Sequence, residues 1–200
     1  MRIGAIVLAA LALSAAGCYR ESVPASETVP AGARVYLQDK GLTDLSAHAA
    51  VLKPELVDYV NLDRNALEVF PAELAKLAGL KWLRLNGNRL SSLPELKALV
   101  NLRRIYLRDN RFAAVPEALK DLPSLTDVDL SGNPIAEVPA WLAEKKGLEN
   151  LSFTGTKITS LPKNLEAWKS LKSLQLGQLS LTPGEMARVR KVLPGVAVIF

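Results

Sequence analysis

Apolar residues recur along most of the chain in a fixed order, and that order repeats. Six blocks fit the pattern L-x-x-L-x-L-x-x-N-x-L, with Val, Ile or Phe in place of Leu at some positions. The blocks begin at Val57, Leu80, Leu102, Leu125, Leu148 and Leu171, so their starts are 23, 22, 23, 23 and 23 residues apart. A period this constant indicates tandem structural units, each stacked on the one before it.

The L-x-L part of each block predicts a short β-strand. Successive side chains of a strand point to opposite faces, so Leu83 and Leu85 point to the same side. One unit cannot bury such an apolar edge alone, and stacked neighbours must share a continuous core. Most blocks are followed by an apolar residue and a proline, such as Val115 and Pro116. Because proline suits the first position of a helix, we expect short helices or 3-10 turns on the side opposite the strands.

Degenerate repeats are expected at both ends of the six blocks, which together cover 57–182. Residues 33–56 keep the strand pattern and form an atypical first repeat. The sequence Thr182-Pro183-Gly184-Glu185 is a capping box with proline at the first helical position, so it predicts a helix over 183–192. The apolar residues 196–200 then predict a last strand, and 183–200 form the C-terminal cap.

The block pattern and its period resemble the leucine-rich repeat family, in its class of 22 to 23 residues per repeat. The resemblance implies an α/β solenoid, with a curved parallel sheet of about eight strands on the concave side and short helices or 3-10 turns on the convex side. It also implies that the consensus asparagines form a structural ladder by bonding the backbone of adjacent turns: Asn65, Asn88, Asn110 and Asn133. Thr156 and Leu179 replace asparagine in the last two blocks, so the ladder should fade there.

The N-terminal residues 1–17 have the pattern of an export signal. Arg2 precedes an uncharged run over 3–16, which would span about 21 Å as a helix and is too short for a hydrocarbon core of about 30 Å. The run ends in Ala15-Ala16-Gly17-Cys18, which resembles the lipobox of bacterial lipoproteins and implies acylation of Cys18, for instance by palmitate. A signal peptide without lipidation is the alternative. Residues 18–32 are rich in Pro, Ser, Thr and Glu and predict a flexible tether.

The composition excludes several classes of function. The single cysteine and single histidine rule out a disulfide framework and Cys- or His-cluster metal sites, and they leave little for triad chemistry. The net charge of +5 is mild and includes 20 acidic residues, so it does not indicate nucleic-acid binding. We therefore expect no cofactor and no enzymatic activity, and we interpret His48 as a structural residue.

The side chains that point outward from the predicted strands are mostly aromatic and basic in the first three blocks. In the fourth block, two of them are aspartates. Trp, Tyr and Arg dominate binding hot spots, because each covers a large area and carries a polar group. Our hypothesis is that a protein or peptide, with acidic groups that meet the arginines, binds here on the concave face. The alternative is a solvated face with Arg–Asp pairs across adjacent strands. The candidate residues are Tyr59, Trp82, Arg84, Arg104, Tyr106, Arg108, Asp127 and Asp129.

These observations together predict a non-catalytic protein-interaction module, anchored by a lipid at Cys18 to a membrane of the bacterial envelope. The outer membrane is favoured, because Tyr19 is not the aspartate that retains lipoproteins of some Gram-negative families in the inner membrane. A structural spacer in the envelope is the first alternative. An accessory subunit of an enzyme complex is the second.

Overall fold

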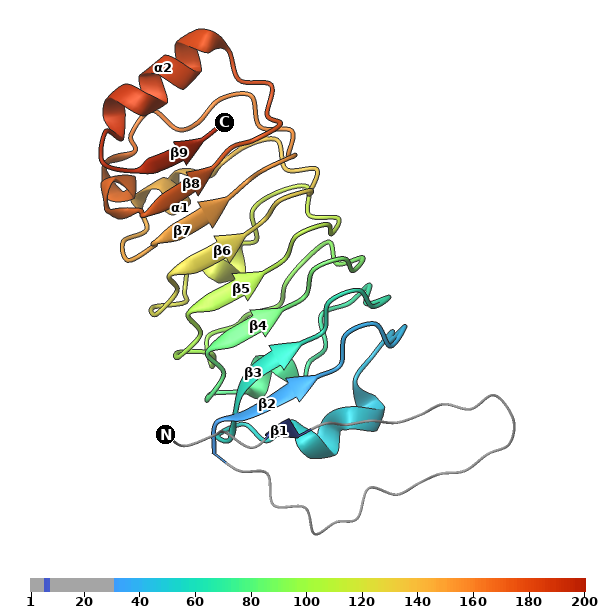
Figure 1. The fold of residues 1–200 in the computed structure, drawn as a ribbon. Coiled ribbons are helices and arrows are strands. Elements are labelled where there is room, and N and C mark those ends of the chain that lie inside the picture. The colour runs from blue at the N-terminus through green and yellow to red at the C-terminus, as the bar shows by residue number, and fades with distance from the viewer. Residues whose placement is uncertain (1–5, 8–30) are drawn as a thin grey trace.

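The computed structural model describes residues 6–7 and 31–200, and it shows a single parallel sheet whose strands follow one another in sequence order (Figure 1). Each strand pairs with the next one: β1 (Ile6–Val7), β2 (Ala33–Tyr36), β3 (Val57–Asn61), β4 (Trp82–Arg84), β5 (Arg104–Tyr106), β6 (Asp127–Asp129), β7 (Asn150–Ser152), β8 (Ser173–Gln175) and β9 (Ala197–Ile199). The leucine-rich repeat solenoid predicted from the sequence is confirmed.

Strands β2 to β9 are the eight that the repeats predict, and β1 adds a ninth. The two residues of β1 pair with Arg34 and Val35 of β2, and they belong to the segment interpreted as an export signal. The rest of that segment, Cys18 and most of the expected tether lie outside the described residues.

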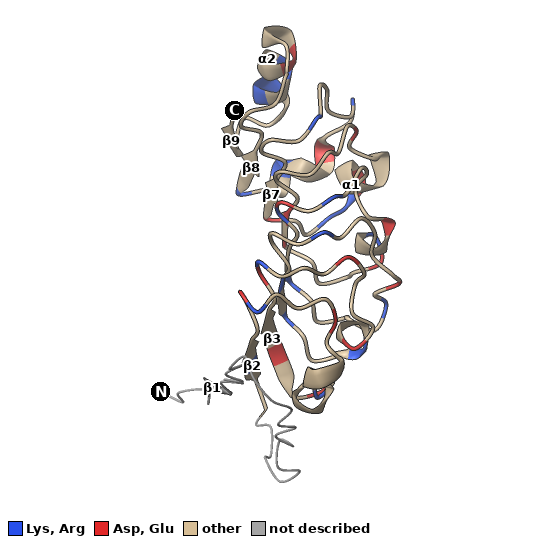
Figure 2. Ribbon diagram, turned by 90° about the vertical axis from the view of Figure 1, so that its right-hand side faces the viewer, with Lys and Arg blue, Asp and Glu red and all other residues tan. Residues whose placement is uncertain are grey.

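Short helices connect most of the strands, and one longer helix comes near the C-terminus. They are the 3-10 helices η1 (Ser46–Val51), η2 (Leu74–Lys76), η3 (Glu117–Leu119) and η4 (Glu166–Ser170), and the α-helices α1 (Ala140–Glu144) and α2 (Pro183–Val192). Figure 2 shows α1 on the side of the molecule opposite β7 to β9, with the sheet on the hollow side. Among the described helices, none has both the length and the apolar character needed to cross a membrane.

The core lies between the sheet and these connections, and leucine fills most of it. Leu83, Leu85, Ile105 and Leu107 are completely buried, as the L-x-L pattern predicts. Full burial of one such side chain stabilises the fold by about 1.5–3 kcal/mol, so each repeat depends on its neighbours for most of its stability. Trp168 is also completely buried, and its indole Nε1 donates a hydrogen bond of 2.9 Å to the carbonyl of Leu142.

A second set of contacts, between turns, is made by buried asparagines. The Nδ2 of Asn110 donates to the carbonyls of Leu85 and Leu107 at 2.9 and 3.0 Å, and its Oδ1 accepts from the backbone N–H of Leu90 at 3.0 Å. Bonds of the same pattern are made by Asn65, Asn88 and Asn133. We call this series the asparagine ladder. At the next equivalent position, the buried hydroxyl of Thr156 has no hydrogen-bond partner within the described residues.

Loss of a ladder asparagine should destabilise the fold much more than a change at Thr156. We expect Asn110→Ala to lower the free energy of unfolding by about 2–4 kcal/mol, because it leaves the buried N–H of Leu90 without a partner and removes one of the two side-chain donors to each of the carbonyls of Leu85 and Leu107. Thr156→Val removes an unpaired hydroxyl at nearly constant shape, so it should be neutral or stabilising. Urea unfolding followed by circular dichroism measures both variants, and equal losses would contradict this account of the ladder.

Helix α2 is held to the preceding repeat by two charged side chains. The Nη2 of Arg188 donates to the carbonyls of Leu161 and Pro162 at 3.1 and 3.2 Å. The Oε1 of Glu185 accepts from Arg188 at 2.8 Å and from the backbone N–H of Leu161 at 2.8 Å. Hydrogen bonding from Arg188 holds the pKa of the Glu185 carboxyl below its ordinary value. The pair therefore takes the place of the ladder at the C-terminal end of the array.

The contact of Glu185 should make stability depend on pH. Because its pKa is lower in the folded state, the ionised carboxyl stabilises the fold above the unfolded pKa of about 4.3, and this contribution is lost as the pH falls through the folded pKa. We expect Glu185→Gln to be less stable than the wild type at neutral pH, with the difference closing below about pH 4. Thermal unfolding of both proteins at several pH values measures this difference in stability. A difference that does not change with pH would refute this role of the Glu185 charge.

Candidate functional site

The strand register brings the predicted outward residues into two rows across the sheet. In the first row, Tyr59 lies opposite Trp82, Trp82 opposite Arg104, and Arg104 opposite Asp127. In the second row, Arg84 lies opposite Tyr106, and Tyr106 opposite Asp129. The alternating burial along β4 and β5 places both rows on the outward face of the sheet, and Figure 2 shows the sheet on the hollow side of the solenoid.

Four aromatic rings form a continuous series across strands β2 to β5. The ring centroids are 5.2 Å apart for Tyr36 and Tyr59, 5.0 Å for Tyr59 and Trp82, and 5.7 Å for Trp82 and Tyr106. The last two pairs meet edge to face, at interplanar angles of 82° and 81°. Edge-to-face pairs of this kind contribute about 0.5–1.5 kcal/mol beyond the burial of their area, so the series is a stable surface.

Arginine side chains lie over these rings. The guanidinium carbon is 4.8 Å from the ring centroid of Tyr59 for Arg34, and 5.1 Å from that of Trp82 for Arg104. The corresponding distance from Arg84 to Tyr106 is 5.7 Å. Cations within about 6 Å of an aromatic face are attracted to it, so the rings fix the positions of the arginines. We call these residues the concave cluster: Arg34, Tyr36, Tyr59, Trp82, Arg84, Arg104 and Tyr106.

Two of these arginines also pair with carboxylates of neighbouring strands or turns. The Nε of Arg84 donates to the Oδ2 of Asp63 at 2.7 Å, and Asp63 is only 2% exposed. The Oδ1 of Asp63 accepts from the backbone N–H of Asn86 at 2.8 Å, so this carboxylate is firmly placed. The Nε of Arg104 lies 3.8 Å from the Oδ2 of Asp127. Cross-strand Arg–Asp pairs, which the sequence offers as the alternative to a binding surface, are therefore present.

Three of the predicted residues are not exposed on the concave face as expected: Tyr59, Asp127 and Arg108. Tyr59 points outward but is only 7% exposed, because Tyr36, Trp82 and Arg34 cover it, and this burial raises the pKa of its phenol. Asp127 also points outward from the sheet but is buried, with only 9% of its surface exposed.

Arg108 lies just beyond β5 and does not join the concave cluster. Its Nε donates to the carboxylate of Asp109 at 3.1 Å, within the same turn. Its backbone N–H donates to the side chain of Asn86 at 2.9 Å, which ties the turn to the preceding repeat. Since the residue belongs to a turn rather than to the strand, strand alternation does not place it on the face.

The outward face carries two shallow hollows of different character. The first, which we call the basic hollow, encloses about 200 Å³ at the start of β3 to β5 and is lined by Arg34, Asp58, Tyr59, Lys81, Trp82, Arg103 and Arg104. The second, the polar hollow, encloses about 150 Å³ over β5 to β8. Its polar lining is formed by Tyr106, Asp127, Asp129, Asn150, Ser152, Ser173 and Gln175. The same sheet thus presents positive charge at one end and carboxylates, amides and hydroxyls at the other.

Sequence reasoning missed several residues of this surface. Arg34 and Tyr36 belong to the degenerate first repeat, which lies outside the six blocks whose outward positions the sequence pattern defines. Lys81 and Arg103 occupy the position just before each strand, which the L-x-L pattern leaves undefined. Reading one residue further toward the N-terminus of every block would have found both.

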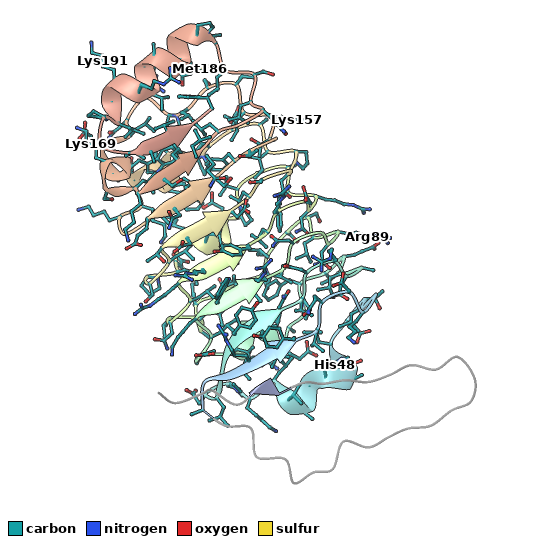
Figure 3. The ribbon with its side chains drawn as sticks, in the orientation of Figure 1. His48, Arg89, Lys157, Lys169, Met186 and Lys191 are labelled. Atoms are coloured by element: carbon teal, nitrogen blue, oxygen red, sulfur yellow. The ribbon has the colours of Figure 1, made fainter. Side chains whose placement is uncertain are left out.

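Within residues 6–7 and 31–200, no group of three or more His, Cys, Asp or Glu side chains is arranged to hold a metal ion. His48, on η1 (Figure 3), is partly buried, and desolvation lowers the pKa of its imidazole.

Comparisons with known proteins find partial sequence similarity and a shared fold. No family model matches the chain. It is similar to keratocan of Danio rerio, with 30% identity over 90 residues, and to podocan of Mus musculus, with 38% identity over 71 residues. These matches cover 42% and 33% of this chain but only 24% and 12% of the relatives.

Two solved bacterial structures share the fold over most of the chain. A leucine-rich repeat protein of Leptospira interrogans matches with a TM-score of 0.68 and 28% identity, over 83% of this chain and 48% of its own. An internalin of Listeria monocytogenes matches with a TM-score of 0.62 and 18% identity, over 80% of this chain and 51% of its own. The chain therefore spans about half the length of these proteins.

The repeated sequence, the solenoid and these similarities define the chain as a leucine-rich repeat protein.

Proposed function

We propose that this protein is a non-catalytic interaction module that binds a protein or peptide through the outward face of its sheet. The observation that carries the proposal is the concave cluster, in which four rings and three arginines lie side by side across β2 to β5. Rings and guanidinium groups of this kind supply most of the binding energy at protein interfaces. The residues of the concave cluster stand on β2 to β5, and each of these strands pairs with a strand on both sides.

A binding surface and a structural spacer differ in how the charges on the outward face are paired. A spacer needs only a solvated face whose charges compensate one another, as Arg84 does with Asp63. Within the described residues, however, no carboxylate lies at ion-pair distance from Arg34 or Arg103, and both side chains are exposed. Positive charge next to the half-buried rings of Trp82 and Tyr106 favours the binding role.

Export and anchoring are the second part of the proposal. The uncharged run over 3–16 and the sequence Ala15-Ala16-Gly17-Cys18 support an exported protein whose Cys18 carries lipid. Each buried CH₂ contributes about 0.8 kcal/mol, so several acyl chains would hold the protein firmly at a membrane of the bacterial envelope. Residues 18–32 would then separate the solenoid from the lipid surface, with the outer membrane as the favoured site.

Partner capture tests the binding role. We expect Trp82→Ala combined with Arg104→Ala to reduce crosslinking of the partner to a photoreactive group at Gln175 about tenfold or more, because truncation of hot-spot residues costs about 2 kcal/mol or more. The matched control is Trp141→Ala with Arg89→Ala, which changes the same residue types away from the sheet. Loss of crosslinking in both variants, or in neither while the fold is retained, would contradict binding at the concave cluster.

Lipid attachment is tested in cells. We expect a radioactive fatty acid to label the wild-type protein and not Cys18→Ala, because the thiol of Cys18 is the only one in the chain. Fractionation of the two membranes then measures the location of the labelled protein. Equal labelling of Cys18→Ala would exclude this residue as the attachment site.

A further inference from the structure

The basic hollow is formed by arginines that approach two adjacent rings from opposite sides. Arg34 reaches from β2 over Tyr59 on β3, with 4.8 Å between the guanidinium carbon and the ring centroid. Arg104 reaches from β5 over Trp82 on β4, at 5.1 Å. Since the two rings are themselves only 5.0 Å apart, the two guanidinium groups converge over one pair of rings. A guanidinium stacked in this way keeps its edge N–H groups available to a ligand.

The charges around this hollow are not balanced. Its lining contains four cationic side chains and one carboxylate, Asp58, which lies 3.5 Å from the Nζ of Lys81. Arg104 has only the distant contact of 3.8 Å with Asp127. By contrast, Arg84 on the second row is committed to the buried Asp63, so it is neutralised. The excess positive charge is therefore concentrated in the basic hollow and not spread over the whole face.

We propose that the basic hollow binds carboxylate side chains of an acidic segment of a protein partner. The inference rests on the proposed interaction role and names the chemistry of the partner. Arginine forks bind carboxylates in a bidentate manner, and such charge-assisted bonds are about twice as strong as neutral ones. The half-buried ring of Trp82 lines the hollow and offers apolar surface to the CH₂ groups of Asp or Glu, whereas the ring of Tyr59 is covered by Arg34.

The polar hollow on the same face favours a peptide over a uniform polyanion. Asp127 and Asp129 on β6 line it, together with the amide of Asn150. Its centre lies three strands from that of the basic hollow, or about 14 Å at about 4.8 Å per strand. A phosphate-rich or sulfated chain that runs along the face would bring negative charge against these carboxylates. A peptide can change its charge from residue to residue, with acidic side chains in the basic hollow and basic side chains about four extended residues away.

Binding of synthetic peptides tests this assignment, with calorimetry of the purified protein at low salt. The first probe is the capped peptide Glu-Glu-Gly-Ser-Gly-Lys-Lys, and the second has the same composition in the order Glu-Lys-Gly-Ser-Gly-Lys-Glu. Inorganic phosphate and a sulfated polysaccharide are the competing anions. We expect the first peptide to bind more tightly than the second, and neither anion to displace it at equal charge concentration.

The matched variants remove two positive charges at different places. Arg34→Gln with Arg103→Gln should weaken binding of the first peptide about tenfold or more, because it removes two of the four cations. Arg89→Gln with Lys157→Gln makes the same change in charge on exposed side chains of the turns beyond the strands (Figure 3), and it should alter binding by less than about twofold. All four side chains are exposed, so both variants should keep the unfolding transition of the wild type.

Three results would overturn the inference. They are no detectable binding of the first peptide to the wild type, equal weakening in the two variants, and displacement of the peptide by phosphate or the polysaccharide. Failure of this inference is distinguishable from failure of the proposed function. If crosslinking of the partner depends on Trp82 and Arg104 but not on Arg34 and Arg103, the concave cluster binds a partner by other chemistry, and only the acidic segment is excluded.

Discussion

The structure depends on one constraint, which is that successive turns stack in register. Each of the strands β2 to β8, three to five residues long, makes its hydrogen bonds with the turns before and after it, and the core leucines are covered by their equivalents in those turns. The asparagine ladder satisfies the backbone groups that the turns would otherwise leave buried and unpaired, such as the carbonyls of Leu85 and Leu107. A repeat outside the stack would lose both its core and its hydrogen bonds.

The outward face follows from the same register. Because equivalent residues of adjacent repeats lie about 4.8 Å apart, a substitution in one repeat meets the side chains of two others directly. This spacing lets Tyr59 contact both Tyr36 and Trp82, and it lets Arg34 and Arg104 reach the same pair of rings. The difference between the basic hollow and the polar hollow then arises from the order of the repeats along the chain.

The repeat period predicted most of the fold, because it fixes both the strand positions and the order of pairing. It placed Trp82, Arg84, Arg104 and Tyr106 correctly on one face. It could not predict that Tyr59 would be covered, since burial on a sheet surface depends on the conformations of long neighbouring side chains. Nor could it predict the convergence of Arg34 and Arg104, because the direction in which an arginine leans is set by the nearest ring and not by its place in the repeat.

The end of the asparagine ladder at Thr156 has a mechanical consequence. From Asn65 to Asn133 the turns are joined by buried side-chain bonds as well as by the strands, whereas β7 to β9 are joined by the strands, by the exposed pair of Lys172 and Glu149 and by the contacts of Arg188 and Glu185. Because each repeat of a solenoid contacts only its neighbours, deformation concentrates at the interfaces with the fewest connections. The C-terminal coils are therefore the compliant part, able to flex against a bound object while the coils that carry the concave cluster keep their shape.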